Sequence, residues 1–314
     1  MRLLTRLAWF AGSLLLASLL IFAATNLLPG DIANVLLGTN ASPEAVAQLR
    51  GELGLDRPFL LRYLEWLGGV VTGDFGTSMI TGRSVTATIA PRIEVSAWLV
   101  LFATVGSLLL ALPVGTYAAL RRRHADGVAV SAASQVGLAV PAFWAGIWLV
   151  VLFAVTLRWL PAGGYVSYWD SFGEWVRHLV LPVTALSIVQ ASVLSRYVRS
   201  AVIDVLHTDY FRTARAVGWG KVGALWRHGL RNISISLLTV VGLQIATLLV
   251  GAIIIEQVFA IPGLGSRLLL AVTQRDLVVV QGIVLVLVWA VLLINFLVDV
   301  AYQFIDPRLK REAR

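Results

Sequence analysis

A polar stretch between two apolar runs decides the fold. It reads Asp209-Tyr210-Phe211-Arg212-Thr213-Ala214-Arg215-Ala216-Val217-Gly218. Asp209 is placed to cap a short helix, on which Tyr210, Ala214 and Val217 recur at helical spacing. Gly218 is placed to end this helix as the first residue beyond its C-cap. The stretch therefore predicts a short amphipathic helix, followed by a sharp turn, between two membrane spans.

The sequence continues through Trp219-Gly220-Lys221 to His228-Gly229-Leu230-Arg231. We expect a second short helix here, with Val222, Leu225 and Trp226 on one side and an end near Gly229. Together the two helices make a loop over residues 206–231 that lies across the cytoplasmic mouth of a helical bundle. Such a loop has the shape of an element gripped by a partner protein from the cytoplasm.

The composition is that of a membrane protein. The 314 residues are 58% hydrophobic and 13% charged, and the mean hydropathy is +0.84, which is too apolar for a soluble domain. The absence of Cys excludes disulfides and thiolate metal sites. The net charge of +8 does not indicate nucleic-acid binding, because the basic residues flank apolar spans, where membrane insertion accounts for them.

Six apolar runs are long enough to cross a bilayer, which needs about 20 residues. They cover residues 7–28, 95–120, 128–157, 179–205, 233–258 and 278–298. We expect an all-α protein with six transmembrane helices and both termini in the cytoplasm, since most of the Lys and Arg residues then lie inside. Residues 1–28 form a lead and the first span, 95–305 the core and 306–314 a basic tail. A cleaved signal peptide is the alternative for the first span, and retention is favoured.

Residues 29–94 hold the one long polar interruption and are expected to fold outside the membrane. Ser42 and Pro43 begin a helix that ends before Gly54, and Asp56 begins a second one with Phe59, Tyr63 and Leu67 on one face.

The sequence lacks the signatures of several other function classes. There is no P-loop, no H-E-x-x-H zinc motif and no G-x-S-x-G elbow. Carboxylates are nearly absent from the middle of the spans, which argues against an ion-coupled secondary transporter. Neutral polar residues lie deeper, among them Gln135, Gln190 and Gln244. They could line a solute path or simply hydrogen-bond between helices.

The central loop resembles the EAA loop of ABC-transporter permeases, in the variant of the dipeptide, oligopeptide and nickel importers. That variant is similar to Tyr-x-Arg-Thr-Ala-Arg-Ala-x-Gly followed by Arg-His-x-Leu-Arg-Asn. This chain has Tyr210, Arg212-Thr213-Ala214-Arg215-Ala216, Gly218 and Arg227-His228-Gly229-Leu230-Arg231-Asn232. It differs from the general EAA pattern at Arg212-Thr213 and Arg231. Similar signatures include Leu28-Pro29-Gly30-Asp31, Gly73-Asp74-Phe75-Gly76-Thr77-Ser78 and Asp306-Pro307-Arg308.

The resemblance implies a type I permease fold in a bacterial inner membrane, and a subunit that is not an enzyme. Its function would be import of di- or oligopeptides, with nickel, glutathione or haem as alternative substrates; a membrane scaffold or enzyme is a remoter possibility. The implied partners are a second homologous permease subunit, two ATPase subunits or domains that carry ATP and Mg²⁺, and an extracytoplasmic binding protein. No metal, cofactor or nucleic acid would be bound by this chain.

The resemblance also implies two groups of site residues. The ATPase-coupling group consists of Asp209, Tyr210, Arg212, Thr213, Ala214, Arg215, Ala216, Gly218 and His228. The family has a run similar to Glu-x-Val-Phe-x-x-Pro-Gly-x-Gly, which places an outer gate at Glu256, Phe259, Pro262 and Gly263. Gln135, Gln190 and Gln244 are the further candidates for the translocation path.

Overall fold

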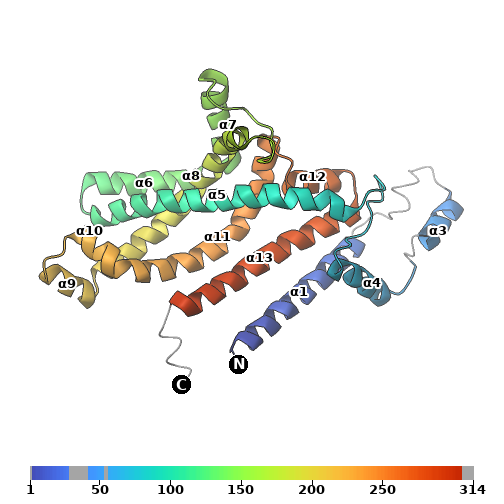
Figure 1. Ribbon diagram of the computed structural model, residues 1–314, viewed down its shortest axis with the longest axis horizontal. Helices are drawn as coiled ribbons and strands as arrows, with labels where there is room; N and C mark the ends of the chain where they lie inside the picture. The colour runs from blue at the N-terminus through green and yellow to red at the C-terminus, as the bar shows by residue number, and fades with distance from the viewer. Residues whose placement is uncertain (1, 28–41, 53–55, 306–314) are drawn as a thin grey trace. The chain divides into compact units, whose positions relative to one another are not determined.

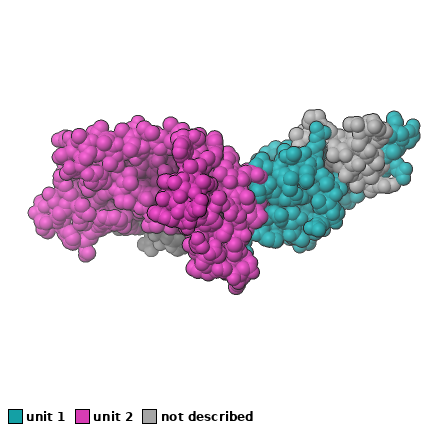
Figure 2. All heavy atoms as spheres, turned by 90° about the horizontal axis from the view of Figure 1, so that it is seen from above, with its two compact units in different colours: residues 1–94, 266–292 teal, residues 95–265, 293–314 magenta. Residues whose placement is uncertain are grey.

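The computed structural model describes residues 2–27, 42–52 and 56–305, and its regular elements there are helices (Figure 1). Their bounds are α1 Arg2–Leu27, α3 Pro43–Glu52, α4 Phe59–Val71, α5 Val85–Leu120, α6 Ala125–Ala139, α7 Ala142–Leu149, η1 Val150–Thr156, α8 Phe172–Leu206, α9 Asp209–Ala216, α10 Lys221–Ala224, η2 Leu225–Gly229, α11 Leu230–Val258, α12 Leu264–Thr273 and α13 Leu277–Ile305. Two compact units are distinguished in Figure 2: residues 1–94 with 266–292, and residues 95–265 with 293–314. Each is described by itself. The predicted tail over residues 306–314 lies outside the described residues.

Five of the described helices are long and apolar enough to cross a membrane: α1, α5, α8, α11 and α13. The predicted third span, 128–157, is not one straight helix. It is divided into α6 and the pair α7–η1, which meet at a bend of 100°. The described chain therefore has six spans if this bent pair counts as one, and five otherwise.

The bend follows from Pro141. Proline lacks the N–H that would continue the helix and disfavours helical geometry in the residue before it. Val140 (φ −85°, ψ 117°) and Pro141 (φ −63°, ψ 139°) are both extended. Two consecutive extended residues break the helix completely.

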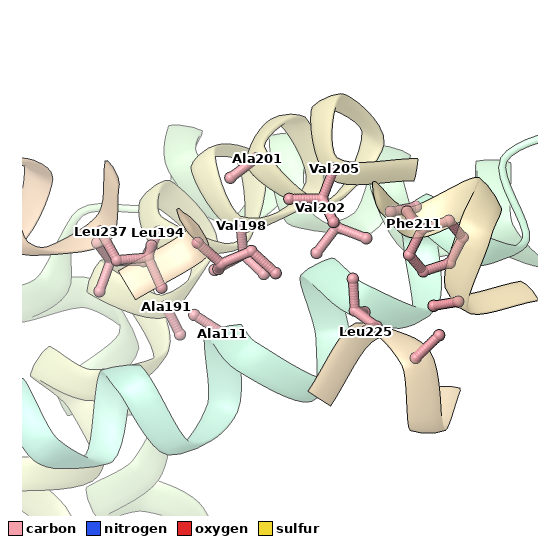
Figure 3. Close-up of a cluster of buried hydrophobic side chains, with 14 residues drawn as sticks. Ala111, Ala191, Leu194, Val198, Ala201, Val202, Val205, Phe211, Leu225 and Leu237 are labelled. Carbon is pink, nitrogen blue, oxygen red and sulfur yellow. The ribbon is translucent and has the colours of Figure 1, made fainter. Parts of the chain in front are cut away.

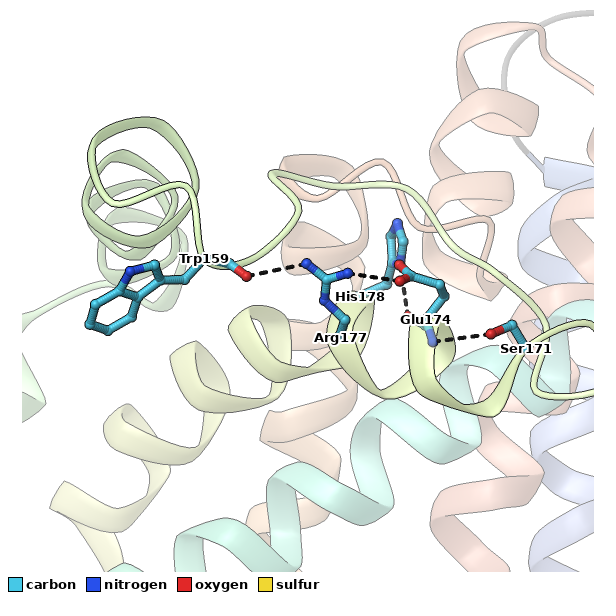
Figure 4. A network of polar contacts seen from close by, with 5 residues as sticks. All are labelled: Trp159, Ser171, Glu174, Arg177 and His178. Carbon is cyan, nitrogen blue, oxygen red and sulfur yellow. Dashed lines mark hydrogen bonds and ion pairs between the residues drawn. The ribbon is translucent and has the colours of Figure 1, made fainter.

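Two spans begin seven or more residues before their apolar runs. α5 begins at Val85, ten residues before the predicted start, so the predicted external segment 29–94 includes its first turns. α8 begins at Phe172, where Ser171 Oγ accepts a hydrogen bond from the Glu174 N–H (3.4 Å). Arg177 then donates to Glu174 Oε1 (2.8 Å) and to the Trp159 carbonyl (3.3 Å), which ties the preceding loop to the helix (Figure 4).

In the first unit, the predicted helix at Ser42-Pro43 is confirmed: α3 begins at Pro43, and Ser42 Oγ accepts from the Ala45 N–H (3.2 Å). The next helix, α4, begins at Phe59 rather than at Asp56. Its buried Tyr63 places its hydroxyl 2.9 Å from Ser18 Oγ on α1. The predicted C-terminal stop of α3 at Gly54 lies outside the described residues.

In the second unit, α8 is the helix against which the others pack, and small residues allow the close approach. A Cβ on Gly115 of α5 would lie 2.5 Å from the Ser195 carbonyl oxygen, and one on Gly137 of α6 would lie 2.2 Å from Ser192 Oγ. Such close approaches at small residues are typical of membrane helices, where van der Waals packing replaces the hydrophobic effect. The position of α8 matters because its C-terminal end leads directly into α9.

Candidate functional site

The short helix α9 forms where it was predicted, but its N-cap is Thr208 rather than Asp209. Asp209 is the first helical residue, and its Oδ1 lies 3.4 Å from Arg212 Nη1 in an exposed ion pair. A carboxylate in the first turn still interacts favourably with the helix dipole. The Thr208 hydroxyl makes no capping bond and donates instead to the Val205 carbonyl (2.6 Å) at the end of α8.

Gly218 ends α9 as predicted. Its φ is +100°, a left-handed conformation that favours glycine. The Trp219 N–H donates to the Ala214 carbonyl (3.2 Å) and the Gly218 N–H to the Arg215 carbonyl (3.1 Å). These are the two bonds of the Schellman motif. The chain therefore reverses at Gly218 with the last carbonyls of α9 satisfied.

The buried face of α9 differs from the predicted one. Phe211 and Ala214 are 5% and 8% exposed, whereas Tyr210 is 38% and Val217 76% exposed. Phe211 and Ala214 belong to a cluster with residues of α5, α8, η2 and α11, including Val202, Val205 and Leu225 (Figure 3). Full burial of a Phe side chain contributes about 2–3 kcal/mol. α9 is thus fixed to the core of its own chain, and Ala214 belongs to this anchor rather than to an accessible surface.

The predicted second short helix does not end near Gly229. α10 passes through the π-helical segment η2 into α11, and Gly229 keeps helical angles (φ −93°, ψ −28°). Leu225 is buried, while Val222 and Trp226 are about half exposed, so the three residues do not share one face. A Cβ on Gly229 would lie 2.8 Å from Val205 Cγ1, so this glycine packs η2 against α8 instead of ending a helix.

Polar and aromatic contacts connect α9 to the start of α11. Asn232 Nδ2 donates to the Tyr210 hydroxyl (2.8 Å). The Trp219 ring has the Arg227 guanidinium 5.4 Å from its centroid and the His228 ring at 5.9 Å in an edge-to-face arrangement. His228 therefore supports the corner that follows α9.

The remaining predicted residues of α9 form its outer face. Arg212, Thr213, Arg215 and Ala216 are all exposed. The Thr213 hydroxyl donates to the Asp209 carbonyl (3.0 Å), and the arginines can make charge-assisted hydrogen bonds to a partner. A helix held on one side and polar on the other would transmit a push from a partner to α8 and α11, because all three share one core.

The predicted outer gate is a closed turn after α11. Glu256 is 1% exposed, and its Oε1 accepts from Ser96 Oγ of α5 (2.6 Å), while the same Ser96 oxygen accepts from the Leu264 N–H (2.8 Å). A Cβ on Gly263 would lie 2.2 Å from the Glu256 carboxyl group. Phe259 is 1% exposed, and its carbonyl accepts from the Gly164 N–H (2.7 Å). Pro262 alone of the four predicted residues is exposed.

The three glutamines predicted for a path are placed differently from one another. Gln190 is buried and Gln244 is half-buried. Gln135 is exposed and lines a polar cavity that neither of the others reaches.

Sequence reasoning missed Ser96, Phe211, Arg196 and Arg199 as residues of interest. Phe211 lies three residues before Ala214, but Tyr210, four residues before it, satisfies helical spacing equally well, so spacing alone does not select Phe211. Ser96 and Glu256 are 160 residues apart, and no local signal joins them.

No group of three or more His, Asp or Glu residues that could hold a metal ion occurs in residues 2–27, 42–52 and 56–305.

The fold and the site define a multi-span membrane protein with a short helix that is anchored by one face and exposes a polar face on the other. The comparisons identify the class. Residues 111–311 match the family described as the binding-protein-dependent transport system inner membrane component, and residues 1–95 match the N-terminal component of such membrane proteins. The chain belongs to this family of ABC importer permeases, which are non-catalytic, multi-pass inner membrane subunits that work with an ATPase and a binding protein.

Relatives match the chain almost from end to end. It is 39% identical over 307 residues to a protein named as a peptide transport system permease of Brucella abortus (strain 2308), with 98% of each chain covered. It is also 39% identical over 308 residues to the glutathione transport system permease GsiC of Salmonella choleraesuis (strain SC-B67), again with 98% of each covered.

A solved structure shares the fold. The inward-facing MetNI methionine ABC transporter (CY5 native crystal form) matches with a TM-score of 0.57 at 17% identity, over 69% of this chain and 96% of that chain.

Proposed function

We propose that this chain is the permease through which di- or oligopeptides enter the cell after delivery by an extracytoplasmic binding protein. The similarity over 98% of its length to a protein named as a peptide permease supports this substrate class. The equal identity to a glutathione permease supports small peptides rather than nickel or haem, because glutathione is itself a tripeptide.

The coupling part of the proposal rests on one observation: Phe211 and Ala214 fix α9 to the core shared with α8 and α11, while Arg212, Thr213, Arg215 and Ala216 face outward. An ATPase that binds this outer face more tightly in one transport state than in the other would bias the positions of both spans. We assign ATP and Mg²⁺ to two such ATPase subunits, none to this chain, and expect a second homologous permease subunit as partner.

The substrate class is tested by uptake into proteoliposomes that hold the whole transporter and its binding protein. Labelled dipeptide and pentapeptide should accumulate only with ATP inside, and an excess of unlabelled peptide should compete. Accumulation of nickel or haem without accumulation of either peptide would contradict the proposal, and uptake without ATP or the partner subunits would indicate a secondary transporter.

The coupling role is tested with a matched pair of alanines. Ala216→Trp adds bulk to the outer face of α9 and should abolish uptake, with loss of the ATPase subunits from the complex or of ATP hydrolysis stimulated by the loaded binding protein. Ala214→Trp adds the same bulk inside the core and should lower the heat stability of the permease itself. Wild-type uptake, subunit retention and stimulated hydrolysis in Ala216→Trp would remove α9 from the coupling mechanism.

A further inference from the structure

A polar cavity of about 130 Å³ lies between α5, α6 and α8. Its lining residues are Gly115 and Ala118 of α5, Ser131, Ser134, Gln135 and Leu138 of α6, and Ser192, Ser195, Arg196 and Arg199 of α8. The volume is about ten times the ~10–15 Å³ that one ordered water needs. The cavity therefore has room for a small polar group with several heavy atoms.

The charge in this cavity has one sign. Two guanidinium groups line it and no carboxylate does. Neither Arg196 nor Arg199 has an ion-pair partner among the described residues, and the buried Arg199 Nε has no hydrogen-bond acceptor there. Arg196 lies over the Tyr197 ring at 5.3 Å, a contact that leaves its charge in place. Arg196 is exposed and Arg199 is half-buried with its Nε atom fully covered. Because a partly buried positive charge without a counter-charge is unfavourable, the cavity favours a negatively charged occupant.

The donors suit an oxyanion. Arginine presents several N–H groups in a fixed plane that matches carboxylate and phosphate oxygens. The Gln135 amide and the Ser131 hydroxyl lie beside them on the cavity wall. The hydroxyl groups of Ser134, Ser192 and Ser195 already donate to backbone carbonyls at 2.9–3.1 Å. Their hydrogens are therefore not available to an occupant of the cavity.

The positions of the two arginines along α8 indicate how deep in the membrane the cavity lies. Residues 179–194 of the span include no charged side chain, and Arg196 and Arg199 are the first two charged residues after them. Arg199 precedes the end of the helix at Leu206 by seven residues, or about 10 Å at 1.5 Å per residue. The two arginines therefore lie at the end of the apolar region that is nearer to α9, where a membrane presents its phosphate headgroups.

We propose that this cavity binds one phosphate or carboxylate oxyanion, carried either by an anionic phospholipid of the adjacent leaflet or by a small soluble molecule. This site is separate from α9, and the proposal does not depend on peptides being the transported solute. The ligand would neutralise Arg199 and hold α6 against α8.

The experiment uses the absence of native Cys. Ser131→Cys places a single thiol in the cavity wall, and its reaction with an uncharged maleimide is followed in the whole transporter, reconstituted in phosphatidylcholine nanodiscs. One arm replaces phosphatidylcholine with phosphatidylglycerol, and the other adds inorganic phosphate. At about ten times its dissociation constant, an occupant should slow labelling roughly tenfold, because about nine-tenths of the sites are then filled.

Matched variants separate the site from general surface charge. Arg199→Gln should remove the protection, Arg199→Lys should retain most of it, and Arg123→Gln, which removes an exposed charge outside the cavity, should leave it unchanged. A thiol at the exposed Ala133, on the same helix but outside the cavity lining, should label at one rate throughout.

Slowing by phosphatidylglycerol alone identifies a lipid headgroup, and slowing by phosphate alone identifies a soluble ligand; either supports the proposal. If neither phosphatidylglycerol nor phosphate slows labelling, the proposal is overturned. This result is expected if a carboxylate of the partner permease already pairs with the arginines. Equal slowing in Arg199→Gln overturns it as well.

Discussion

The ends of α9 and α11 have the same hydrogen-bonding motif, but the first lies in open space and the second is enclosed by neighbouring side chains. At α9 the left-handed residue is Gly218, with open space around its Cα. At α11 it is Ala260 (φ +50°), and the Ile261 and Ala260 N–H groups donate to the Glu256 and Gln257 carbonyls (2.8 and 3.3 Å). Three residues on, Gly263 has no positive φ but is enclosed by the Glu256 carboxyl group. Glycine is thus needed for backbone angle in one turn and for space in the other.

The difference shows why the two turns suit different roles. The α9 corner is exposed at its glycine, where an added side chain would meet no neighbouring atom of its own chain. The α11 turn is closed by the buried Glu256, Phe259 and Ile261, so a change there is transmitted to the interior of its own chain. A moving gate at this turn would have to break the Ser96–Glu256 contact.

The largest effect is expected for Gly263→Leu. The new side chain would displace the Glu256 carboxyl group from Ser96 and overpack a closed site, which should cost about 3 kcal/mol or more in stability. The measurement is the midpoint of heat-induced aggregation of the purified permease complex.

The size series Gly263→Ala and Gly263→Leu should show a growing loss of stability. Normal heat stability and normal uptake in Gly263→Leu would mean that the turn is open, and the contrast with Gly218 would disappear.

Ser96→Ala is expected to have the next largest effect. It removes the donor to the buried Glu256 carboxyl group and the acceptor for the Leu264 N–H. Each hydrogen bond contributes about 0.5–1.5 kcal/mol, so the expected loss of stability is about 1–3 kcal/mol. Ser96→Thr keeps the hydroxyl and serves as control. If both variants aggregate at the wild-type temperature, Ser96 does not hold the turn closed.

Gly218→Val should lower stability by about 1–2 kcal/mol, since a β-branched residue is strained at positive φ. Uptake should be lost to a greater extent than this small loss of stability explains, because the corner sets the direction of α9. Gly218→Asn, which tolerates this conformation, is the comparison variant and should keep most of the uptake. A Val variant as stable and active as the Asn variant would show that φ is not what selects glycine here.

The smallest effect is expected for Ala260→Gly. The left-handed conformation costs Ala260 about 1–2 kcal/mol, whereas glycine adopts it freely but loses about 0.5–1 kcal/mol more in chain entropy. Stability should therefore rise by about 0.5–1 kcal/mol. The same heat-aggregation assay measures it. A loss of stability would indicate that the Ala260 methyl group makes packing contacts that outweigh the strain.

The sequence predicted features that depend on neighbouring residues. The apolar runs found the spans, Gly218 predicted the end of α9, and Ser42-Pro43 predicted the start of α3. It misjudged features that depend on competition between contacts. Thr208 and Asp209 are both of residue types that cap helices. Thr208 is the N-cap in the structure, where its hydroxyl is also bonded to the end of α8. α12 was not foreseen, since its ten residues are too few for a span.

The buried contacts of both candidate sites could not be predicted, for a physical reason. Phe211 faces the core because α8 and α11 offer an apolar cluster there, whereas spacing alone allowed Tyr210 to take that place. Pro141 was compatible with a kink or with a complete break, and the extended angle of Val140 decided between them.

The π-helical segment η2 has a consequence for the orientation of the α9 corner. A π turn accommodates one residue more than an α turn, and each residue of an α-helix advances the next by about 100°. Five residues in Leu225–Gly229 therefore turn the chain about as far as four residues of an α-helix would, so removing one of them and restoring α geometry would leave the direction of α10 nearly unchanged. A residue removed from the α-helical part of α11 would instead rotate α10, and the corner attached to it, by about 100° around the axis of α11. The π segment thus holds one extra residue without altering the angle between a membrane span and the corner beyond it.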